Sequence, residues 1–537
     1  TETSLPNFRQ GDAIILYERN RDTDNVTNKM VFKGNIEYLT ENEIGIRLRA
    51  TQQNPSVLPA ESLYAIEHDT MDTTFRSMYQ GLYIYLSARK ERRDLLLSQR
   101  PPRFDESLDS MISRSEDDFT RIALKAKAAQ DYFLLIGPPG TGKTSCALKK
   151  MVETFHADKD AQILLLSYTN RAVDEICKSL ASIAPAVDFI RVGSELSCDE
   201  AYRGHLIENE LSSCSRRSEV YERIRNCRII VGTVAAISGK PELFCLKHFD
   251  VAIIDEATQI LEPQLLGILC ARGEDGKDAI DKFVLIGDHK QLPAVVQQNT
   301  EQSAIYDESL LSIGLTNLKD SLFERLYRNC TATVHRSYDM LCRQGRMHPE
   351  VALFANRAFY GGRLIPVGLP HQIESSDTIC RLAFYPSVPE KAGASAKINY
   401  SEARIVADLA ARIYEDHQTD FDESRTLGII TPYRSQIALI KKEIESLGIP
   451  ALNRILVDTV ERFQGSERDV IIYSFCVNYP YQLKFLSNLT EEEGVLIDRK
   501  LNVALTRARK QMFITGVPEL LERNPLYKSL LKLIESF

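Results

Sequence analysis

The 537-residue sequence has no closely spaced cysteine pair, no long apolar run and no excess of positive charge. Its eleven cysteines are scattered singly, without C-x-x-C spacing, which indicates reduced thiols of an intracellular protein rather than a disulfide or metal framework. Apolar runs such as Ile163–Leu166 and Leu265–Leu269 are far too short to cross a bilayer, so we expect no membrane contact. The sequence also shows no signal peptide, internal repeat or low-complexity tract.

The formal net charge of −8 argues against a protein coated with nucleic acid. Binding in a locally basic cleft remains compatible with this charge. With 44% hydrophobic and 26% charged residues, the composition is that of an ordinary globular protein, and its length predicts two to four domains. Because the sequence starts at Thr1 rather than Met, we expect fused or bound partner domains N-terminal to it.

The periodicity of apolar and polar residues changes twice along the chain, and these changes predict its domain organisation. Residues 12–66 alternate apolar and polar positions in short runs, as in a small antiparallel barrel or sheet. From Met71 to about Gln99 apolar residues recur every three or four positions, which predicts one long helix that ends at Pro101-Pro102. From residue 119 short apolar strands alternate with helical stretches, the pattern of parallel α/β sheets. We predict an α/β fold in four parts: an accessory β-barrel (1–68), a helical stalk (69–110), a first parallel-sheet domain (111–325) and a second (326–537).

Three polar segments interrupt this pattern. Residues 194–228 are charged and predict an insertion in the first parallel-sheet domain. Residues 297–320 predict a surface excursion, and residues 386–397 have the composition of a loop.

A phosphate-binding loop is the strongest local signal. The apolar strand Tyr132–Ile136 leads into a glycine-rich loop, and a helix follows, which is the strand–loop–helix setting that such loops require. Glycines allow backbone N–H groups to turn toward phosphate oxygens, and the helix N-terminus adds a favourable dipole. Lys143 would neutralise the β- and γ-phosphates, and the Thr144 hydroxyl would bind Mg²⁺. The predicted nucleotide-binding residues are Gly137, Pro138, Pro139, Gly140, Thr141, Gly142, Lys143 and Thr144.

Two acidic residues follow a second apolar strand, Val251–Ile254. A carboxylate at the C-terminal end of a buried strand can reach Mg²⁺, so Asp255 is the predicted metal ligand. Glu256 is the predicted base that polarises the attacking water. The alternative is that these acids cap a helix.

A third apolar strand, Phe283–Ile286, leads into the sequence GDHKQLP. The Gln291 amide can both donate and accept hydrogen bonds, which suits a sensor of the γ-phosphate. The alternative is an ordinary loop residue.

Seven motifs in a fixed order give the sequence a specific resemblance. After GPPGTGKT, DEATQ and GDHKQLP come QGRMHP (344–349), TPYRSQ (431–436), VDTVERFQGSE (457–467) and LNVALTRAR (501–509). Together they resemble the superfamily 1B helicases, the group of the up-frameshift RNA helicases and of the helicase half of the replication nuclease-helicase. This resemblance spans residues 131–517. It implies two RecA-like domains in tandem that use ATP and Mg²⁺.

Family membership implies roles for three further residues. Arg346 and Arg507 resemble the arginines that reach from the second RecA-like domain onto the γ-phosphate bound by the first. A guanidinium at that position spreads its donors over the oxygens of the transition state. Glu467 resembles the acid that holds the ribose.

The resemblance also implies a nucleic-acid surface shared by both domains. Residues of the SYTNRA and VGT segments resemble backbone-phosphate contacts of the first domain, and residues of the TPYRSQ and VDTV segments resemble those of the second. For the four threonines the alternative is helix capping. The predicted contacts are Thr169, Asn170, Thr233, Thr431, Tyr433 and Thr459.

The sequence departs from the family in two respects. Relatives carry a glutamine that reads adenine about 17 or 18 residues before the phosphate loop, where this chain has Phe119 and Thr120. Relatives have tyrosine where Gly345 lies, so a base-stacking surface is either absent or supplied by Tyr132 or Tyr168. No nuclease constellation and no counterpart of the four iron–sulfur cysteines of nuclease-fused relatives is present.

We therefore predict an ATP-dependent helicase that moves 5′→3′ on a single strand. DNA is the preferred track because 131–137 and 72–76 resemble the replication nuclease-helicase. One alternative is an RNA helicase of the same family. Another is an ATP-gated clamp or remodeller that binds nucleic acid without unwinding it.

Overall fold

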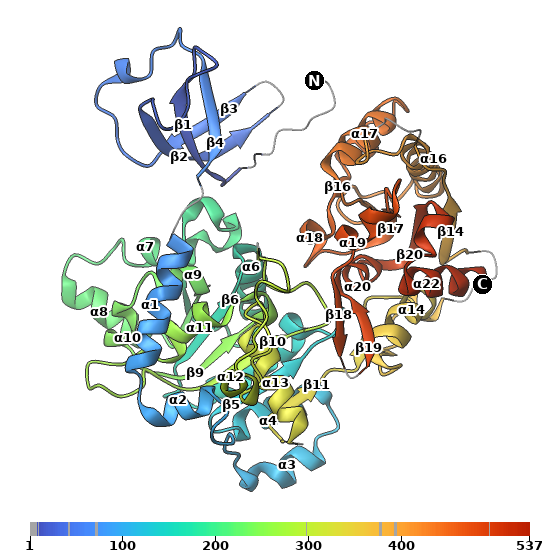
Figure 1. Cartoon of the computed structure of the whole chain (residues 1–537). Helices are drawn as coiled ribbons and strands as arrows, with labels where there is room; N and C mark the ends of the chain where they lie inside the picture. Colours follow the sequence, from blue (N-terminus) through green and yellow to red (C-terminus); the bar gives the residue numbers. More distant parts are fainter. Residues whose placement is uncertain are drawn as a thin grey trace.

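The computed structural model describes residue 8 and residues 10–40, 43–69, 73–296, 298–333, 335–374, 379–390, 395–492 and 494–536. Two α/β lobes lie side by side, and a small β-sheet lies over the first of them (Figure 1). Among the described residues, no helix combines the length and apolarity needed to cross a membrane. The α/β class and the tandem arrangement of parallel sheets match the prediction.

The N-terminal sheet has four antiparallel strands in the order β3-β2-β1-β4. Ile14, Tyr17 and Ile36 form its buried interior. Within the described ranges the edge strands β3 and β4 do not pair, so the strands form an open sheet rather than a closed barrel. Their bounds are β1 Ala13–Glu18, β2 Val31–Leu39, β3 Ile44–Leu48 and β4 Tyr64–His68.

The stalk is two helices, α1 (Thr73–Ser87) and α2 (Lys90–Leu96), so the prediction of one long helix was wrong. The break occurs at Arg89, whose backbone is extended and whose guanidinium forms a bidentate pair with Asp278 of the first lobe. Helix α1 packs against α11 (Glu262–Leu269) at the closely opposed Gly81 and Gly267. A Cβ at Gly81 would lie 2.3 Å from the Pro263 carbonyl oxygen, so only glycine permits this approach.

The first lobe contains a seven-stranded sheet in the order β11-β5-β10-β9-β6-β8-β7, with every pairing parallel. Both faces of the sheet are covered, which is why its central strands are continuous apolar runs. Strand β11 belongs to this sheet although it lies beyond residue 325, so the domain boundary predicted at 325/326 is too early. The strands are β5 Tyr132–Ile136, β6 Ile163–Ser167, β7 Phe189–Val192, β8 Ile229–Thr233, β9 Phe249–Ile254, β10 Ile280–Gly287 and β11 Tyr338–Met340.

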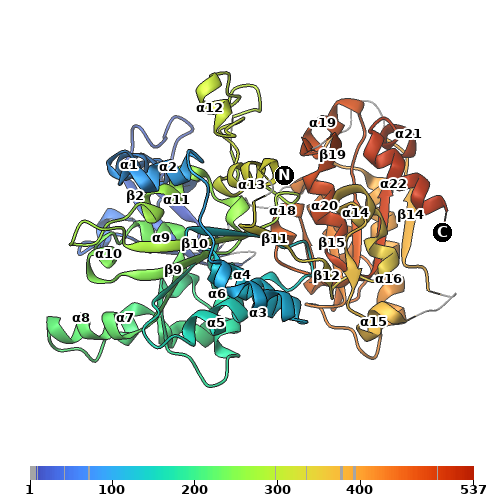
Figure 2. The same cartoon turned by 90° about the horizontal axis from the view of Figure 1, so that it is seen from below.

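Helices surround the first sheet, and two polar segments extend beyond it. Residues 194–228, predicted as an insertion, follow edge strand β7 and contain α7 and α8. The excursion at 297–320 contains α12, which projects from the lobe (Figure 2). The helices are α3 Asp109–Arg114, α4 Asp118–Ala128, α5 Lys149–His156, α6 Asn170–Ala181, α7 Ile207–Glu210, α8 Arg217–Asn226, α9 Val234–Ser238, α10 Glu242–Leu246, α12 Glu308–Ser312 and α13 Leu322–Ala332.

The second lobe contains a five-stranded parallel sheet in the order β14-β20-β17-β15-β16. A hairpin of β18 (Leu489–Glu492) and β19 (Val495–Asp498) extends from it, and β12 (Arg343–Gln344) pairs with β13 (Ile365–Pro366). The sheet strands are β14 Leu382–Pro386, β15 Leu427–Ile430, β16 Leu456–Asp458, β17 Arg468–Ser474 and β20 Ala508–Gly516. The helices are α14 Pro349–Tyr360, α15 Pro370–Ile373, α16 Tyr400–Asp416, α17 Arg434–Glu445, α18 Val460–Phe463, α19 Leu483–Leu486, α20 Arg499–Leu505, α21 Pro518–Leu521 and α22 Pro525–Glu535.

Candidate nucleotide site and nucleic-acid surface

The glycine-rich loop joins β5 to a helical turn that begins at Lys143. Gly140 and Gly142 have φ values of +74° and +77°, a conformation that strongly favours glycine. A Cβ at Gly137 would lie 2.0 Å from Cγ of Lys143, so a larger residue would displace the lysine side chain. The loop geometry therefore requires glycine at the positions where the sequence has it.

The four predicted groups for phosphate and metal chemistry meet at this loop. Lys143 Nζ lies 3.3 Å from Glu256 Oε1, and the Thr144 hydroxyl donates to Asp255 Oδ2 at 2.5 Å. Burial acts to lower the pKa of Lys143, but the Glu256 and Asp255 carboxylates outweigh it and raise that pKa. Burial acts to raise the pKa of Glu256, and Lys143 outweighs it, so the pKa of Glu256 is lowered. Lys143 and Glu256 are thus held as an ion pair.

Within the part of the chain that the structure describes, Asp255 forms no ion pair like that of Glu256 with Lys143, which fits a metal ligand. Burial and the neighbouring Glu256 raise the pKa of Asp255 above its ordinary value. Its carboxylate and the Thr144 hydroxyl lie side by side, and oxygen donors are the ligands that Mg²⁺ prefers. A cation held here would relieve the repulsion between the two adjacent carboxylates. The residues present therefore fit a magnesium site.

Glu256 has the left-handed backbone conformation, with φ of +53°. Such a conformation is costly for glutamate and is typical of functional sites. Oε2 of Glu256 accepts a hydrogen bond from Gln259 Nε2 at 3.0 Å, which orients the carboxylate.

Arg507 approaches the same site from the second lobe. Its guanidinium is buried, and Nη2 donates to Gln291 Oε1 at 3.3 Å. Gln291 in turn donates through Nε2 to Asp288 at 2.7 Å. Burial and the neighbouring Arg346 lower the pKa of Arg507 to about 9, so the group remains charged at neutral pH. The predicted sensor and the predicted arginine finger are therefore in direct contact.

Arg346 lies directly on the phosphate loop. The backbone N–H of Gly345 donates to the Gly140 carbonyl at 2.8 Å, and the Arg346 side chain donates to Glu467 at 2.5 Å. Glu467, predicted as the ribose ligand, is thus paired with an arginine of its own lobe. Glu467 and Arg507 immediately precede the parallel strands β17 and β20, so they share the amino edge of the second sheet.

Sequence reasoning missed a hydrogen-bonded chain that joins the lobes beside Gln291. The Tyr360 hydroxyl donates to Asp288 Oδ2 at 2.7 Å, and Asn502 Nδ2 contacts that hydroxyl at 2.8 Å. Asn502 also donates to the Lys290 carbonyl at 2.7 Å. Asp288 and Asn502 lie inside recognised motifs and could have been singled out as buried polar candidates. Tyr360 ends a helix outside every motif and carries no such signal.

The predicted nucleic-acid residues of the first lobe lie at helix N-termini. Thr169 caps α6 by accepting from Ala172 N at 3.2 Å, and Asn170 is the first residue of that helix. Thr233 caps α9 by accepting from Ala236 N at 3.1 Å. The capping alternative is therefore realised at both threonines. Each hydroxyl still has a hydrogen to donate to a phosphate. Thr233 is buried, with only 7% of its surface exposed, so a phosphate would reach it only from one side.

The second-lobe residues follow β15 and β16 at the carboxyl edge of the sheet. Thr459 precedes α18, and the half-buried Tyr433 accepts a hydrogen bond from Gln482 Nε2 at 3.0 Å. Thr431 is fully buried, so its hydroxyl does not face solvent in this structure.

The structure shows the surroundings of the residues named in the two departures from the family, Phe119 and the candidate stacking residues Tyr132 and Tyr168. The Phe119 ring lies beside the phosphate loop, 3.5 Å from where a Cβ of Gly142 would be. Tyr132 is only 2% exposed and stacks on Phe283, so it cannot stack on a base, and that alternative was wrong. Tyr168 is partly exposed and remains available.

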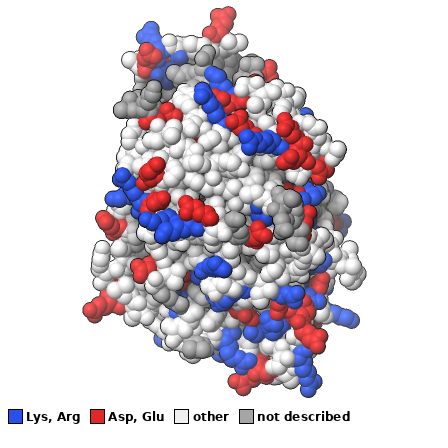
Figure 3. All heavy atoms as spheres, turned by 90° about the vertical axis from the view of Figure 1, so that its right-hand side faces the viewer, with Lys and Arg blue, Asp and Glu red and all other residues white. Residues whose placement is uncertain are grey.

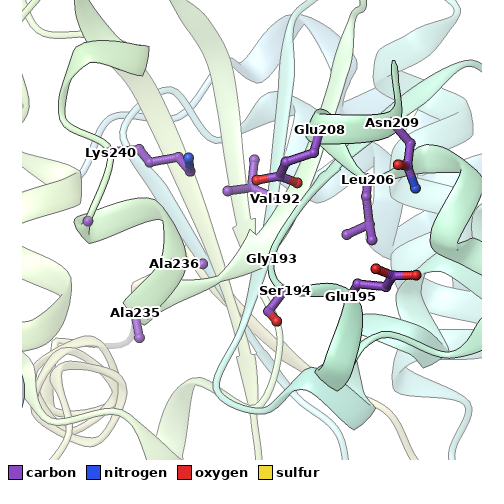
Figure 4. A pocket seen from close by; sticks show the side chains of 11 residues that line it. Val192, Gly193, Ser194, Glu195, Leu206, Glu208, Asn209, Ala235, Ala236 and Lys240 are labelled. Atoms are coloured by element: carbon purple, nitrogen blue, oxygen red, sulfur yellow. The ribbon is translucent and has the colours of Figure 1, made fainter. Parts of the chain in front are cut away.

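On the face seen in Figure 3, the described basic and acidic side chains are interspersed and form no broad basic surface. A cavity of about 590 Å³ lies at the carboxyl end of β7, next to α9 (Figure 4). Glu195, Glu208 and Lys240 line it, so the lining has a net negative charge that would repel a phosphate backbone. A strand that reaches Thr233 is therefore expected to pass over α9 rather than enter this cavity.

Comparisons with known proteins identify similar sequences over most of the chain. A family model described as an AAA domain matches residues 114–220 and 208–299, and a second model with the same description matches residues 318–519. The chain is 27% identical to the DNA replication ATP-dependent helicase/nuclease DNA2 of Bos taurus, with 99% of this chain and 50% of the relative covered. It is 24% identical to the DNA polymerase alpha-associated DNA helicase A of Saccharomyces cerevisiae, with 85% of this chain and 73% of the relative covered.

The chain thus spans about half the length of the bovine relative. Among solved structures, the complex of arterivirus nonstructural protein 10 (helicase) with DNA is similar at 15% identity and a TM-score of 0.38. That match covers 78% of this chain and 65% of the viral chain.

Proposed function

We infer that this chain, a homologue of the superfamily 1 helicases, is an ATP-hydrolysing motor that moves along single-stranded nucleic acid. The observation that carries this proposal is the seam between the lobes. Lys143, Thr144, Asp255 and Glu256 come from the first lobe, and Arg507 reaches Gln291 beside them from the second. A triphosphate at this seam would contact groups from both lobes at once.

The ion pair between Lys143 and Glu256 suggests how ATP activates the base. The γ-phosphate would replace Glu256 as the partner of Lys143, which frees the Glu256 carboxylate to orient a water and accept its proton. Mg²⁺, when held by Thr144 and Asp255, would withdraw charge from the phosphate oxygens. Arg507 and Arg346 would stabilise the charge that develops on the γ-phosphoryl group.

The same seam couples hydrolysis to movement. Thr169, Asn170 and Thr233 would hold the strand backbone on the first lobe, and Tyr433 and Thr459 would hold it on the second. Closing the lobes on ATP would shorten the distance between these two sets of backbone contacts by about one nucleotide. Hydrolysis would then allow the lobes to separate again. Thr431 would become a contact only if closure exposes its hydroxyl.

DNA is the proposed track, and 5′→3′ the proposed direction. The relatives from Bos taurus and Saccharomyces cerevisiae are named as a DNA replication helicase/nuclease and a DNA helicase. The direction follows from the resemblance to the superfamily 1B group. Because Phe119 lies where relatives have an adenine-reading glutamine, we also propose that other nucleoside triphosphates are hydrolysed.

One set of assays tests this proposal. ATP hydrolysis should be stimulated by single-stranded DNA more than by single-stranded RNA, duplex or no nucleic acid. Duplex separation should require a 5′ tail, and separation with a 3′ tail alone would contradict the direction. Stimulated hydrolysis without any separation would favour the clamp or remodeller, and stronger stimulation by RNA would favour the RNA helicase.

A further inference from the structure

The segment that follows β17 presents aromatic rings to solvent. Tyr481 is 54% exposed and Phe485 is 71% exposed, which is unusual for side chains of this size. The rings of Tyr479 and Tyr481 are nearly parallel, with an interplanar angle of 15° and centroids 5.8 Å apart. Phe485 stands edge-on to Tyr481, with centroids 6.4 Å apart. None of these three residues has a role at the nucleotide site.

This aromatic segment is rigidly mounted. The buried Gln482 accepts hydrogen bonds through Oε1 from the backbone N–H groups of Asn478 and Tyr479, both at 2.9 Å. Leu483 and Leu486 of α19 are buried in the core of the second lobe. The exposed rings therefore project from a fixed base, and little conformational entropy remains to be lost when a ligand packs on them.

The segment lies beside the predicted nucleic-acid contacts. Strand β17 pairs with β15, which leads into Tyr433, so the carboxyl ends of both strands share one edge of the sheet. Gln482, which lies between the exposed rings in sequence, donates to the Tyr433 hydroxyl at 3.0 Å. Helices α18 and α19 are both on the side of the second lobe that is turned toward the first (Figures 1 and 2). A strand held at Tyr433 and Thr459 would pass within reach of the rings.

Charge favours nucleic acid as the occupant. Lys484, which lies between Tyr481 and Phe485 in sequence, is exposed, so the segment that carries the rings also carries a cation. Exposed aromatic rings stack on every base because each base has a π-face, while an adjacent lysine attracts the backbone. An apolar protein partner would gain nothing from an exposed lysine in this segment.

We propose that Tyr479, Tyr481 and Phe485 form a base-stacking platform for the single strand held by the second lobe. This proposal rests on the proposed function, since it requires a strand to bind. It assigns the base contacts to a segment outside all seven motifs, while Gly345 replaces the aromatic residue of relatives and Tyr132 is buried. The platform would hold bases without reading them, which suits a motor that must pass over any sequence.

A binding assay with abasic strands tests the platform. Oligothymidylates with one abasic position, moved stepwise along the strand, are compared with the intact strand for the wild type and for the double variant Tyr481→Ala/Phe485→Ala. The double variant should bind the intact strand roughly 5- to 100-fold more weakly than the wild type does. An abasic position at one or two adjacent places should weaken binding by the wild type but should have little further effect on the variant.

Controls separate the platform from a fold defect and from the motor function. Tyr306→Ala removes a ring that is 82% exposed on the excursion at 297–320 and should bind like the wild type. Tyr481→Phe keeps the ring and should retain most of the affinity. If the double variant shows the same position-dependent losses as the wild type, the platform is excluded while strand binding stands. If the wild type itself neither binds single strands nor hydrolyses ATP in response to them, the proposed function fails as well.

Discussion

The guanidinium Nη2 of Arg507, in the second lobe, lies 3.3 Å from the amide oxygen of Gln291, in the first. Gln291 also donates to Asp288, which accepts a hydrogen bond from Tyr360 of the second lobe. A change at the γ-phosphate position would therefore act on Gln291, which is already hydrogen-bonded to Arg507 of the second lobe. This contact gives a physical route by which hydrolysis alters the relation between the lobes.

Replacing the predicted base should separate nucleotide binding from hydrolysis. Glu256→Gln keeps the size of the side chain but removes the proton acceptor, so kcat should fall by roughly 10²–10⁴ while ATP affinity is kept. Lys143→Ala should abolish hydrolysis and also weaken ATP binding. Steady-state hydrolysis and nucleotide titration measure both effects, with the exposed Glu222→Gln as a control that should hydrolyse normally. Normal hydrolysis by Glu256→Gln would show that another group activates the water.

Strand binding should weaken as salt rises because the proposed contacts are made to phosphates. The logarithm of the binding constant should fall with the logarithm of the salt concentration, with a slope of roughly −0.7 per phosphate neutralised on a single strand. Fluorescence anisotropy over a salt series measures this slope. A flat dependence would contradict a track that holds the backbone.

Base selectivity at the nucleotide site should be weak. Phe119 cannot make the one or two hydrogen bonds to the base that an adenine-reading glutamine makes. Without that contribution, we expect kcat/KM to differ by roughly tenfold or less among the nucleotides. Values of kcat/KM for ATP, GTP, CTP and UTP measure the preference. Strong discrimination for ATP alone would mean that other residues read the adenine.

Stability should fall as pH rises from about 4.5 to 7 because of one buried acid. Burial raises the pKa of Glu402 to about 7, although hydrogen bonds from Ser474 and from the Cys476 backbone act to lower it. The folded state therefore keeps the proton after the unfolded chain has lost it. The stabilisation that this proton gives is fully present below the pKa of Glu402 in the unfolded chain. It is lost as pH rises through the pKa of the folded state, which lowers the free energy of unfolding by about 3 kcal/mol.

The variant Glu402→Gln should flatten this part of the profile. Urea unfolding at several pH values measures it. Glu415→Gln, exposed on the same helix, is the matched control and should keep the slope of the wild type. An identical slope in Glu402→Gln and the wild type would exclude Glu402 as its origin.

The stalk should be sensitive to a single methyl group. Gly81→Ala would place a Cβ against the Pro263 carbonyl, so the stalk must shift and the chain should lose roughly 1–3 kcal/mol of stability. Gly204→Ala meets no atom within 4 Å and should change the melting temperature little. Equal melting temperatures for both variants would contradict the tight packing of α1 on α11.

The sequence grouped the phosphate loop, Asp255, Glu256, Gln291 and Arg507 as one candidate site because each follows an apolar strand or lies in an ordered motif. The structure brings these residues together at the seam, and their catalytic roles stay predictions. Local patterns could not predict contacts between distant segments. Strand β11 joins the first sheet by pairing with β5 about 200 residues earlier, and Arg346 pairs with Glu467 across 121 positions. The break at Arg89 was missed because the helical periodicity continues through it, and its cause is a tertiary pair with Asp278. The burial of Thr431 depends on packing that no local pattern encodes.

Single-turnover hydrolysis of ATP by Arg507→Ala, with the protein in excess and at a concentration that binds all of the ATP, and with single-stranded DNA present, tests most directly whether the second lobe completes the active site. Arg507→Lys keeps the charge without the forked donors, and Arg523→Ala removes an exposed arginine as the control. Thermal unfolding establishes that each variant folds. We predict that Arg507→Ala binds ATP but hydrolyses it roughly 10³–10⁵-fold more slowly, with Arg507→Lys also impaired and Arg523→Ala normal. A folded Arg507→Ala variant that hydrolyses ATP at the wild-type rate would contradict a nucleotide site shared by the two lobes.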